Sequence, residues 1–190
     1  MSESADQYES LSNVYALLSR LWLTEVDADF LNAVIASPIA QTLNVTPDLA
    51  ADPESIEQLA TEYCRLFIGP VNHLPPFQSV WQQGQLQSSV TDSVKSFAQA
   101  IGFSDLADST TLPDHLGIQL QIMSEIIRLF ATEAEPPREY NELAQEFFHR
   151  HLTWPTSFLQ TASARTDSDF YKAVIQLTTD LLESEQANWH

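Results

Sequence analysis

The Asp114–His115 pair is the first place in this chain where residue types and spacing could do chemistry. Pro113 fixes the backbone where an apolar helix is expected to begin, so Asp114 falls in its first turn. A carboxylate there is stabilised by unpaired backbone N–H groups and the helix dipole. An imidazole beside a carboxylate can change charge near neutral pH. The pair fits helix-start capping, which the residue types favour, or a site that recognises a basic partner.

Two other candidates are weaker. His149 and His151 are two residues apart, which places them on different faces of a helix, a poor arrangement for chelating a metal. Cys64 lies inside a predicted apolar helix, where a packed thiol is the usual occupant. The sequence has no P-loop, G-x-G-x-x-G, G-x-S-x-G or H-E-x-x-H motif. The common enzyme classes that carry such motifs therefore lose their usual support, and we expect no cofactor and no metal site. The alternative is a small helical enzyme, metal-dependent or acid/base-dependent, centred on Asp114 and His115.

The elements that must position these residues are helical. Apolar residues recur at helical spacing, and no window shows sustained strand alternation. Asp52-Pro53 predicts a helix start, and Gly69-Pro70 a helix stop. Pro113 and Pro136-Pro137 mark further starts. We expect a bundle of seven or more helices, at about 5–23, 27–37, 53–68, 88–101, 113–135, 137–152, a short one around 158–159, and one from 167.

Residues 69–87 break the helical pattern with two glycines and three prolines. A helix cannot pass through this stretch, yet it carries Leu74, Phe77, Val80 and Trp81, which a solvated linker would not need. We expect a long, ordered, proline-rich loop that packs on the helices and has an edge facing a ligand.

Length and composition limit the function. The 190 residues suit a single domain over 1–190, and 44% hydrophobic residues allow a real core. The formal charge is −18, which argues against a nucleic-acid partner. The acidic N-terminus is unlike a secretory signal, and no apolar run of membrane-spanning length exists. A lone cysteine suits a reducing compartment, so we expect a cytoplasmic protein without stable membrane association.

Three motifs together resemble a known family. Residues 63–70 (YCRLFIGP) with 75–81 (PPFQSVW) resemble the signature Y-x-x-L-F-x-G-P…P-P-x-x-S-V-[YW] of the TorD/DmsD/NarJ-type redox-enzyme maturation chaperones. Residues 113–120 (PDHLGIQL) resemble their P-D-H-[LI]-G-x-E-L motif. His151-Leu152 with Trp154 and Phe158 is similar to a looser third pattern. The three follow the family's order and span nearly the whole chain.

The resemblance implies a TorD-like, all-helical cytoplasmic chaperone without enzymatic turnover. Its partner would be a molybdenum-containing redox-enzyme subunit, bound through a twin-arginine signal peptide, through the body of the subunit, or both, until the cofactor is inserted. Motif residues that shape the structure would be Tyr63, Leu66, Phe67, Gly69, Pro70 and Pro75. Residues that bind the client or its signal peptide would be Asp114, His115, Trp81, Leu116, Gln119, Phe77, Ser79 and Pro76.

The distribution of charge and two departures from the family's motif bear on the expected client-binding surface. Only four of the 26 acidic residues fall within 63–124, which suits a groove for an apolar segment. The family often has acids at the positions of Gln119 and Gln121, so client contacts here are altered or use other carboxylates. Exchange of helices through the 69–87 or 102–113 links would give a homodimer, which the sequence leaves open. The central expectation is that the Trp81 segment and the Asp114 turn meet in space.

Overall fold

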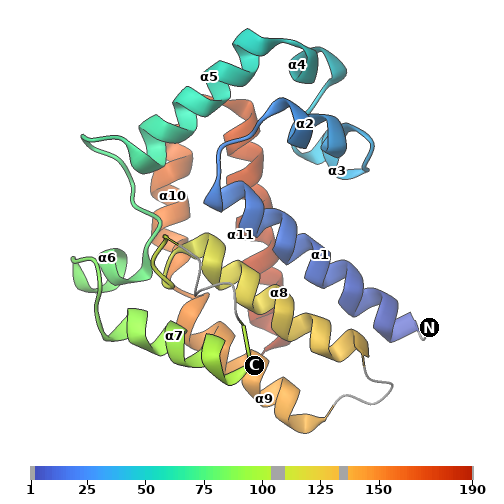
Figure 1. The fold of residues 1–190 in the computed structure, drawn as a ribbon, viewed down its shortest axis with the longest axis vertical. Helices are drawn as coiled ribbons and strands as arrows, with labels where there is room; N and C mark the ends of the chain where they lie inside the picture. Colours follow the sequence, from blue (N-terminus) through green and yellow to red (C-terminus); the bar gives the residue numbers. More distant parts are fainter. Residues whose placement is uncertain (1–2, 104–109, 133–136, 190) are drawn as a thin grey trace. The chain divides into compact units, whose positions relative to one another are not determined.

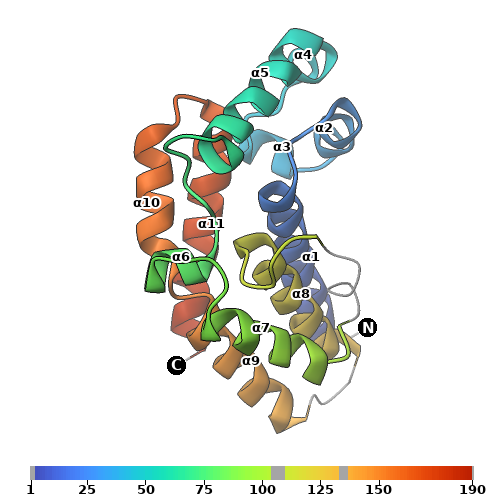
Figure 2. The ribbon, with the colours of Figure 1, turned by 60° about the vertical axis from the view of Figure 1, so that its left-hand side comes forward.

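The computed structural model describes residues 3–103, 110–132 and 137–189, and their regular structure is helical (Figures 1 and 2). These ranges hold eleven α-helices and no β-strand, apart from one isolated antiparallel bridge between Phe77 and His115. The predicted all-α class is confirmed. The chain divides into two compact units. A single domain over 1–190 stays a prediction.

The first unit comprises residues 1–23, 76–155 and 182–190. Its longer helices supply most of the buried apolar residues of this unit. The helices are α1 (Glu3–Leu23), α6 (Gln78–Gln83), α7 (Ser89–Ala100), α8 (Leu116–Thr132), α9 (Arg138–His151) and the last turns of α11 (Asp169–Asn188).

Helices α1 and α8 form an antiparallel pair at the centre of this unit (Figure 1). Tyr8 near the start of α1 packs on Phe130 near the end of α8, with ring centroids 5.1 Å apart. In the middle, Ser12 and Ser124 each donate a side-chain hydrogen bond to the other's carbonyl, at 3.0 and 2.9 Å. The small Ser12 and Ser124 side chains let the two backbones approach closely at this point.

Gly117 lies where the two helices approach closely. A Cβ atom there would lie 2.5 Å from Leu23 Cγ and 3.1 Å from the carbonyl oxygen of Ser19. Alanine improves helix propensity by about 1 kcal/mol, but overpacking costs about 1–3 kcal/mol. We expect Gly117→Ala to destabilise the protein by about 1–2 kcal/mol in urea unfolding. The double variant Gly117→Ala/Leu23→Ala should cost less than the two single changes together. Costs that simply add would contradict this packing.

The second unit comprises residues 24–75 and 156–181. Its core combines aliphatic residues of the short helices with an aromatic cluster in which Tyr63, Phe67, Phe158 and Tyr171 pack edge to face or tilted. Its helices are α2 (Ala28–Ile35), α3 (Ile39–Thr42), α4 (Pro47–Ala51), α5 (Pro53–Tyr63), α10 (Pro155–Arg165) and the first turns of α11.

Local signals explain the limits of α5. The Asp52 carboxylate accepts hydrogen bonds from the backbone N–H groups of Glu54 and Ser55, as the Asp52-Pro53 start predicts. At its other end the helix widens into a π-helical turn, η1 (Cys64–Ile68). The Gly69 N–H closes this turn on the Cys64 carbonyl oxygen at 2.6 Å. The predicted stop at Gly69-Pro70 is confirmed.

The structure differs from the predicted elements in three places. Residues 69–87 contain the short helix α6, because residues 78–83 hold neither proline nor glycine, and Gly84 ends the helix in the left-handed conformation. Helix α8 begins at Leu116 and not at Pro113, because His115 is in the bridge with Phe77. The one-turn helices α3 and α4 had no sequence prediction. Pro136, predicted as a helix start, lies outside the described residues.

None of the helices in the described ranges combines the length and the apolar character needed to cross a membrane.

Candidate functional site

The Trp81 segment and the Asp114 turn lie together in the first unit. The Gln78 N–H donates to the Asp114 carbonyl at 3.0 Å, and the Leu116 N–H donates to the Pro76 carbonyl at 2.8 Å. These bonds flank the bridge between Phe77 and His115. The prediction that the two motif segments meet is therefore confirmed, although they are 35 residues apart in the chain.

The Asp114 carboxylate links three elements. Its Oδ2 accepts from the Ser79 N–H at 2.9 Å, and its Oδ1 accepts from Thr91 Oγ1 at 3.0 Å. Ser79 is in the first turn of α6, whose own N-cap residue, Phe77, makes no side-chain cap. Asp114 thus caps α6 from a distant segment and holds the first turn of α7. The expectation that it lies in the first turn of its own helix and caps it is wrong, since α8 begins after it.

His115 takes over the capping of α8. Its Nδ1 accepts from the Gly117 N–H at 3.0 Å, which places the proton of the neutral ring on Nε2. The ring also meets Phe77 edge to face at 4.9 Å. Burial lowers the pKa of His115 to about 4, with the nearby Asp114 charge opposing the shift. His115 is therefore a neutral structural side chain at physiological pH.

A second buried network joins the third motif to the other two. Gln119 Nε2 donates to Gln78 Oε1 at 2.6 Å, and Gln119 Oε1 accepts from Trp154 Nε1 at 2.8 Å. Gln78 Nε2 in turn donates to the Arg150 carbonyl at 2.7 Å. His151 Nδ1 lies 3.0 Å from Gln78 Oε1. The three sequence motifs therefore share one continuous hydrogen-bond network.

The network fixes the state of His151. Because Gln78 Oε1 can only accept, His151 Nδ1 must carry the proton, and Nε2 then accepts from Ser93 Oγ at 3.1 Å. Burial, followed by the Arg150 charge, lowers the pKa of His151 to about 4, against the opposing effect of Asp114. Protonation of Nε2 would remove the acceptor for Ser93.

Both histidines make stability depend on pH. In the unfolded chain they take up protons below about pH 6.5, whereas the folded protein keeps them neutral down to about pH 4. The unfolded state therefore binds more protons in this window, and stability falls as the pH falls through it. The limit is about 3 kcal/mol for each histidine. Urea unfolding at pH 7 and at about pH 5 measures the loss.

His115→Asn is the matched control for this prediction. An asparagine Oδ1 can replace Nδ1 as acceptor, but it does not titrate. The variant should lose clearly less stability than the parent protein between pH 6.5 and pH 5. An equal loss in both proteins would mean that His115 does not contribute to the pH dependence.

Most of the predicted client-binding residues are buried. The structure buries Pro76, Ser79, Asp114, His115, Leu116 and Gln119. Phe77 and Trp81 are half-buried and are the two of this set with substantial exposed surface. Client binding by these eight residues stays a prediction. In this conformation the buried six can act only by positioning the others.

An open pocket of about 570 Å³ adjoins the Asp114 network, lined by the start of α7 and the residues before Asp114. Thr91, which donates to Asp114, is part of its wall, and Asp92 and Lys95 add one charge of each sign. Sequence reasoning missed this pocket and the roles of Gln78 and Thr91. Gln78 lies inside a quoted motif, so its polar type was a signal. The residues that line the pocket are Gln87, Ser88, Thr91, Asp92, Lys95 and 110–113.

The first half of the first motif lies in the second unit. Tyr63, Leu66 and Phe67 are buried in its aromatic core, while Gly69 and Pro75 are half-buried and Pro70 is exposed. Gly69 makes a close backbone contact, since a Cβ atom there would lie 3.2 Å from the Cys64 carbonyl oxygen. These positions accord with a structural role, which stays a prediction.

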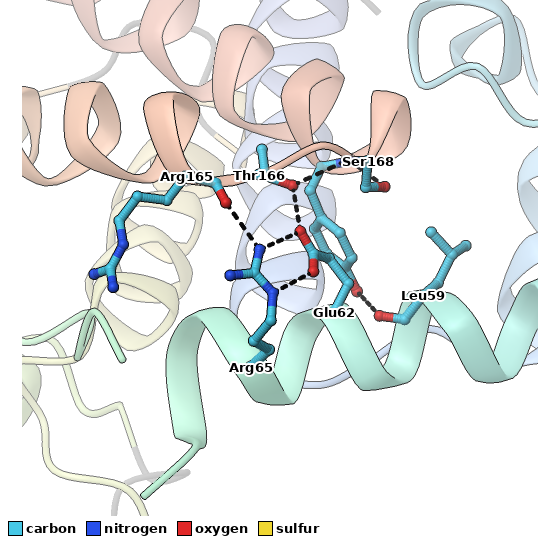
Figure 3. A network of polar contacts seen from close by, with 7 residues as sticks. Leu59, Glu62, Arg65, Arg165, Thr166 and Ser168 are labelled. Atoms are coloured by element: carbon cyan, nitrogen blue, oxygen red, sulfur yellow. Dashed lines mark hydrogen bonds and ion pairs between the residues drawn. The ribbon is translucent and has the colours of Figure 1, made fainter. Parts of the chain in front are cut away.

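A polar cluster ties this motif to the corner between α10 and α11 (Figure 3). Arg65 donates to both carboxylate oxygens of Glu62, at 2.7 and 2.8 Å, and to the Arg165 carbonyl at 2.8 Å. Thr166 Oγ1 donates to the same carboxylate at 2.8 Å. The Arg65 hydrogen bonds are the main cause that lowers the pKa of Glu62. Arg65 therefore joins Glu62 of α5 to the backbone at the end of α10.

The remaining chemical candidates have other partners. Cys64 is exposed, so its predicted packing in the core is wrong, because the buried face of this segment is formed by Tyr63, Leu66 and Phe67. His149 Nε2 bonds the Trp189 carbonyl at 2.6 Å, whereas His151 bonds Gln78 and Ser93. Within the described residues, no group of three or more histidine, cysteine, aspartate or glutamate side chains is arranged to hold a metal ion.

Comparisons with known proteins agree with the motifs. The model of the nitrate reductase delta subunit family matches residues 25–160. The chaperone protein TorD of Escherichia coli O139:H28 (strain E24377A / ETEC) is 23% identical over 198 residues, covering 95% of this chain and 96% of TorD. TorD of Shigella boydii serotype 18 (strain CDC 3083-94 / BS512) is also 23% identical, with the same coverage.

A solved structure supports the fold. The crystal structure of a candidate redox enzyme maturation protein from Archaeoglobus fulgidus aligns with a TM-score of 0.59 and 21% identity. It covers 92% of this chain and 93% of that protein. Because the family model matches well over half of the chain, the protein belongs to the nitrate reductase delta subunit family, the family of the TorD- and NarJ-type maturation chaperones.

Proposed function

We propose that the protein is a cytoplasmic chaperone that binds a subunit of a molybdenum-containing redox enzyme while the cofactor is inserted. It also binds the subunit's twin-arginine signal peptide and delays export. The observation that carries the proposal is the convergence of three maturation-chaperone motifs in one hydrogen-bond network in the first unit. The full-length similarity to proteins named TorD supports it.

The surface around this network suits a client with cationic and apolar parts. Phe77 and Trp81 are only half-buried, and a partly exposed aromatic residue can stack on an arginine guanidinium or pack on apolar side chains. The adjoining pocket offers the Asp92 carboxylate and several hydroxyl groups. The formal charge of −18 attracts a basic peptide over long distances at low salt.

The buried residues have a positioning role in this proposal. Asp114 holds the start of α6, the helix that carries Trp81, and it holds Thr91 at the wall of the pocket. Gln119 and Gln78 hold the same segment against Trp154 and His151. A pre-organised surface loses little conformational entropy when a peptide binds.

Calorimetric titration with a synthetic signal peptide tests the function. The probe carries two consecutive arginines followed by an apolar run of about 12 residues. We expect low-micromolar binding at low salt, about tenfold weaker binding by Trp81→Ala, and weaker binding as salt rises. A peptide with two lysines instead controls for charge alone and should bind less well, because lysine lacks the planar group that stacks. Absence of binding at tens of micromolar in low salt would contradict signal-peptide recognition.

A further inference from the structure

We propose that Ile68, Pro70 and Val71 form a docking surface, the apolar tip, for an apolar polypeptide segment with a basic residue beside it. The inference deepens the proposed function and rests on it, since the segment with this chemistry is the signal peptide of the client. The apolar tip belongs to the second unit, whereas the polar network around Asp114 belongs to the first.

The exposure of this surface is unusual for the molecule. Ile68 is 62% exposed and Val71 is 72% exposed. In the described ranges, Leu86, at 54%, is the other large apolar side chain with comparable exposure, and it lies in the first unit. A single exposed apolar residue needs no explanation. Two β-branched side chains on either side of Gly69-Pro70, with Pro70 also exposed, form a local apolar surface.

The backbone holds the apolar tip in place. The Gly69 N–H bonds the Cys64 carbonyl at 2.6 Å, and the Leu74 N–H bonds the Leu66 carbonyl at 2.6 Å. These two bonds close the base of the loop that leaves the end of α5 (Figure 1). Pro70 and Pro75 restrict the backbone further. Such a loop can present apolar side chains to a partner with a small entropic cost.

Charge complementarity selects the occupant. Cys64 is exposed one helical turn before Ile68, and its Sγ lies 3.8 Å from the Glu25 carboxylate. A carboxylate therefore lies beside Cys64, at the start of the turn that ends at Ile68. The second unit has 11 acidic and 3 basic residues, a net charge of −8. A basic residue next to an apolar run is attracted here, whereas an acidic partner, including a second copy of this chain, is repelled.

Fluorescence anisotropy with the labelled twin-arginine peptide tests this inference. We expect Ile68→Ser and Val71→Ser each to bind about tenfold more weakly than the parent protein, because each removes a buried apolar contact from the complex. Ala51→Ser is the control, since it makes an exposed apolar side chain polar at the end of α4 in the same unit, and its affinity should not change. Glu25→Gln should weaken binding about threefold at low salt and less at high salt.

The single cysteine gives a second, independent measurement. Saturating peptide should slow the alkylation of Cys64 severalfold, because the exposed thiol lies in the same turn as Ile68. If the peptide binds but both serine variants bind equally well and Cys64 reacts at its free rate, the docking surface is refuted and the proposed function stands. If the parent protein does not bind the peptide at all, signal-peptide recognition fails and the docking surface fails with it.

Discussion

Replacing Asp114 by alanine is expected to destabilise the protein by about 3–5 kcal/mol. The change leaves two buried donors without a partner, the Ser79 N–H and the Thr91 hydroxyl, and each such group costs about 1–3 kcal/mol. It also removes two hydrogen bonds to a charged acceptor. Urea unfolding followed by circular dichroism measures the loss. A cost below about 1 kcal/mol would mean that Asp114 does not hold α6 and α7.

Asp114→Asn separates the structural role of this side chain from its charge. The asparagine Oδ1 can accept from the Ser79 N–H, and its Nδ2 can donate to Thr91 Oγ1. Both hydrogen bonds can therefore form, with donor and acceptor reversed in the bond to Thr91. We expect a smaller cost of about 1–2 kcal/mol. Peptide affinity should stay within about threefold of the parent protein, because Asp114 positions the surface without touching the client. A loss of tenfold or more in a folded Asp114→Asn protein would show that the client senses the charge itself.

The second large effect is expected at Gln119. Its amide donates to Gln78 and accepts from Trp154, so the network needs one donor and one acceptor at this position. A glutamate there would place a fully buried charge against Gln78 Oε1, or force Gln78 to turn and lose its bond to the Arg150 carbonyl. We expect Gln119→Glu to cost about 2–4 kcal/mol at pH 7.

Gln121→Glu is the matched control for this change. Gln121 is only half-buried, so a carboxylate there should cost less than about 0.5 kcal/mol. The loss in Gln119→Glu should shrink, relative to the parent protein, as the pH falls, because a protonated glutamate can donate to Gln78 again. Unfolding of both variants at pH 7 and about pH 5 checks this. Equal costs at the two positions would contradict the network.

The elements with local signals could be predicted from the sequence. The start of α5 follows from Asp52-Pro53, and its end from Gly69-Pro70, because both act on neighbouring backbone groups. The helices α3, α4 and α6 were missed because they have six residues or fewer, too few for a period of 3.6 to show. The exposure of Cys64 was not predicted, because the residues around it are both polar and apolar. The sequence pattern there does not decide which of two adjacent residues faces the core.

The site could be predicted only in outline. The motifs indicated that the Trp81 segment and Asp114 belong together, and the hydrogen bonds between them confirm it. The partner of each polar side chain depends on tertiary packing. Asp114 lies next to the start of α8 in the sequence, yet it caps α6, while His115 caps α8. No local rule predicts that Asp114 caps α6, because the Ser79 N–H is 35 residues from Asp114 in the sequence.

Hydrogen exchange of the intact chain, with and without the twin-arginine peptide, tests whether the motif network supports the client-binding surface. We expect bound peptide to slow exchange in residues 76–91, where the motif network holds α6 and the first turn of α7. Exchange in α4, which has no part in either proposed surface, should not change. Saturating peptide that binds without slowing exchange anywhere in 76–91 would contradict the account.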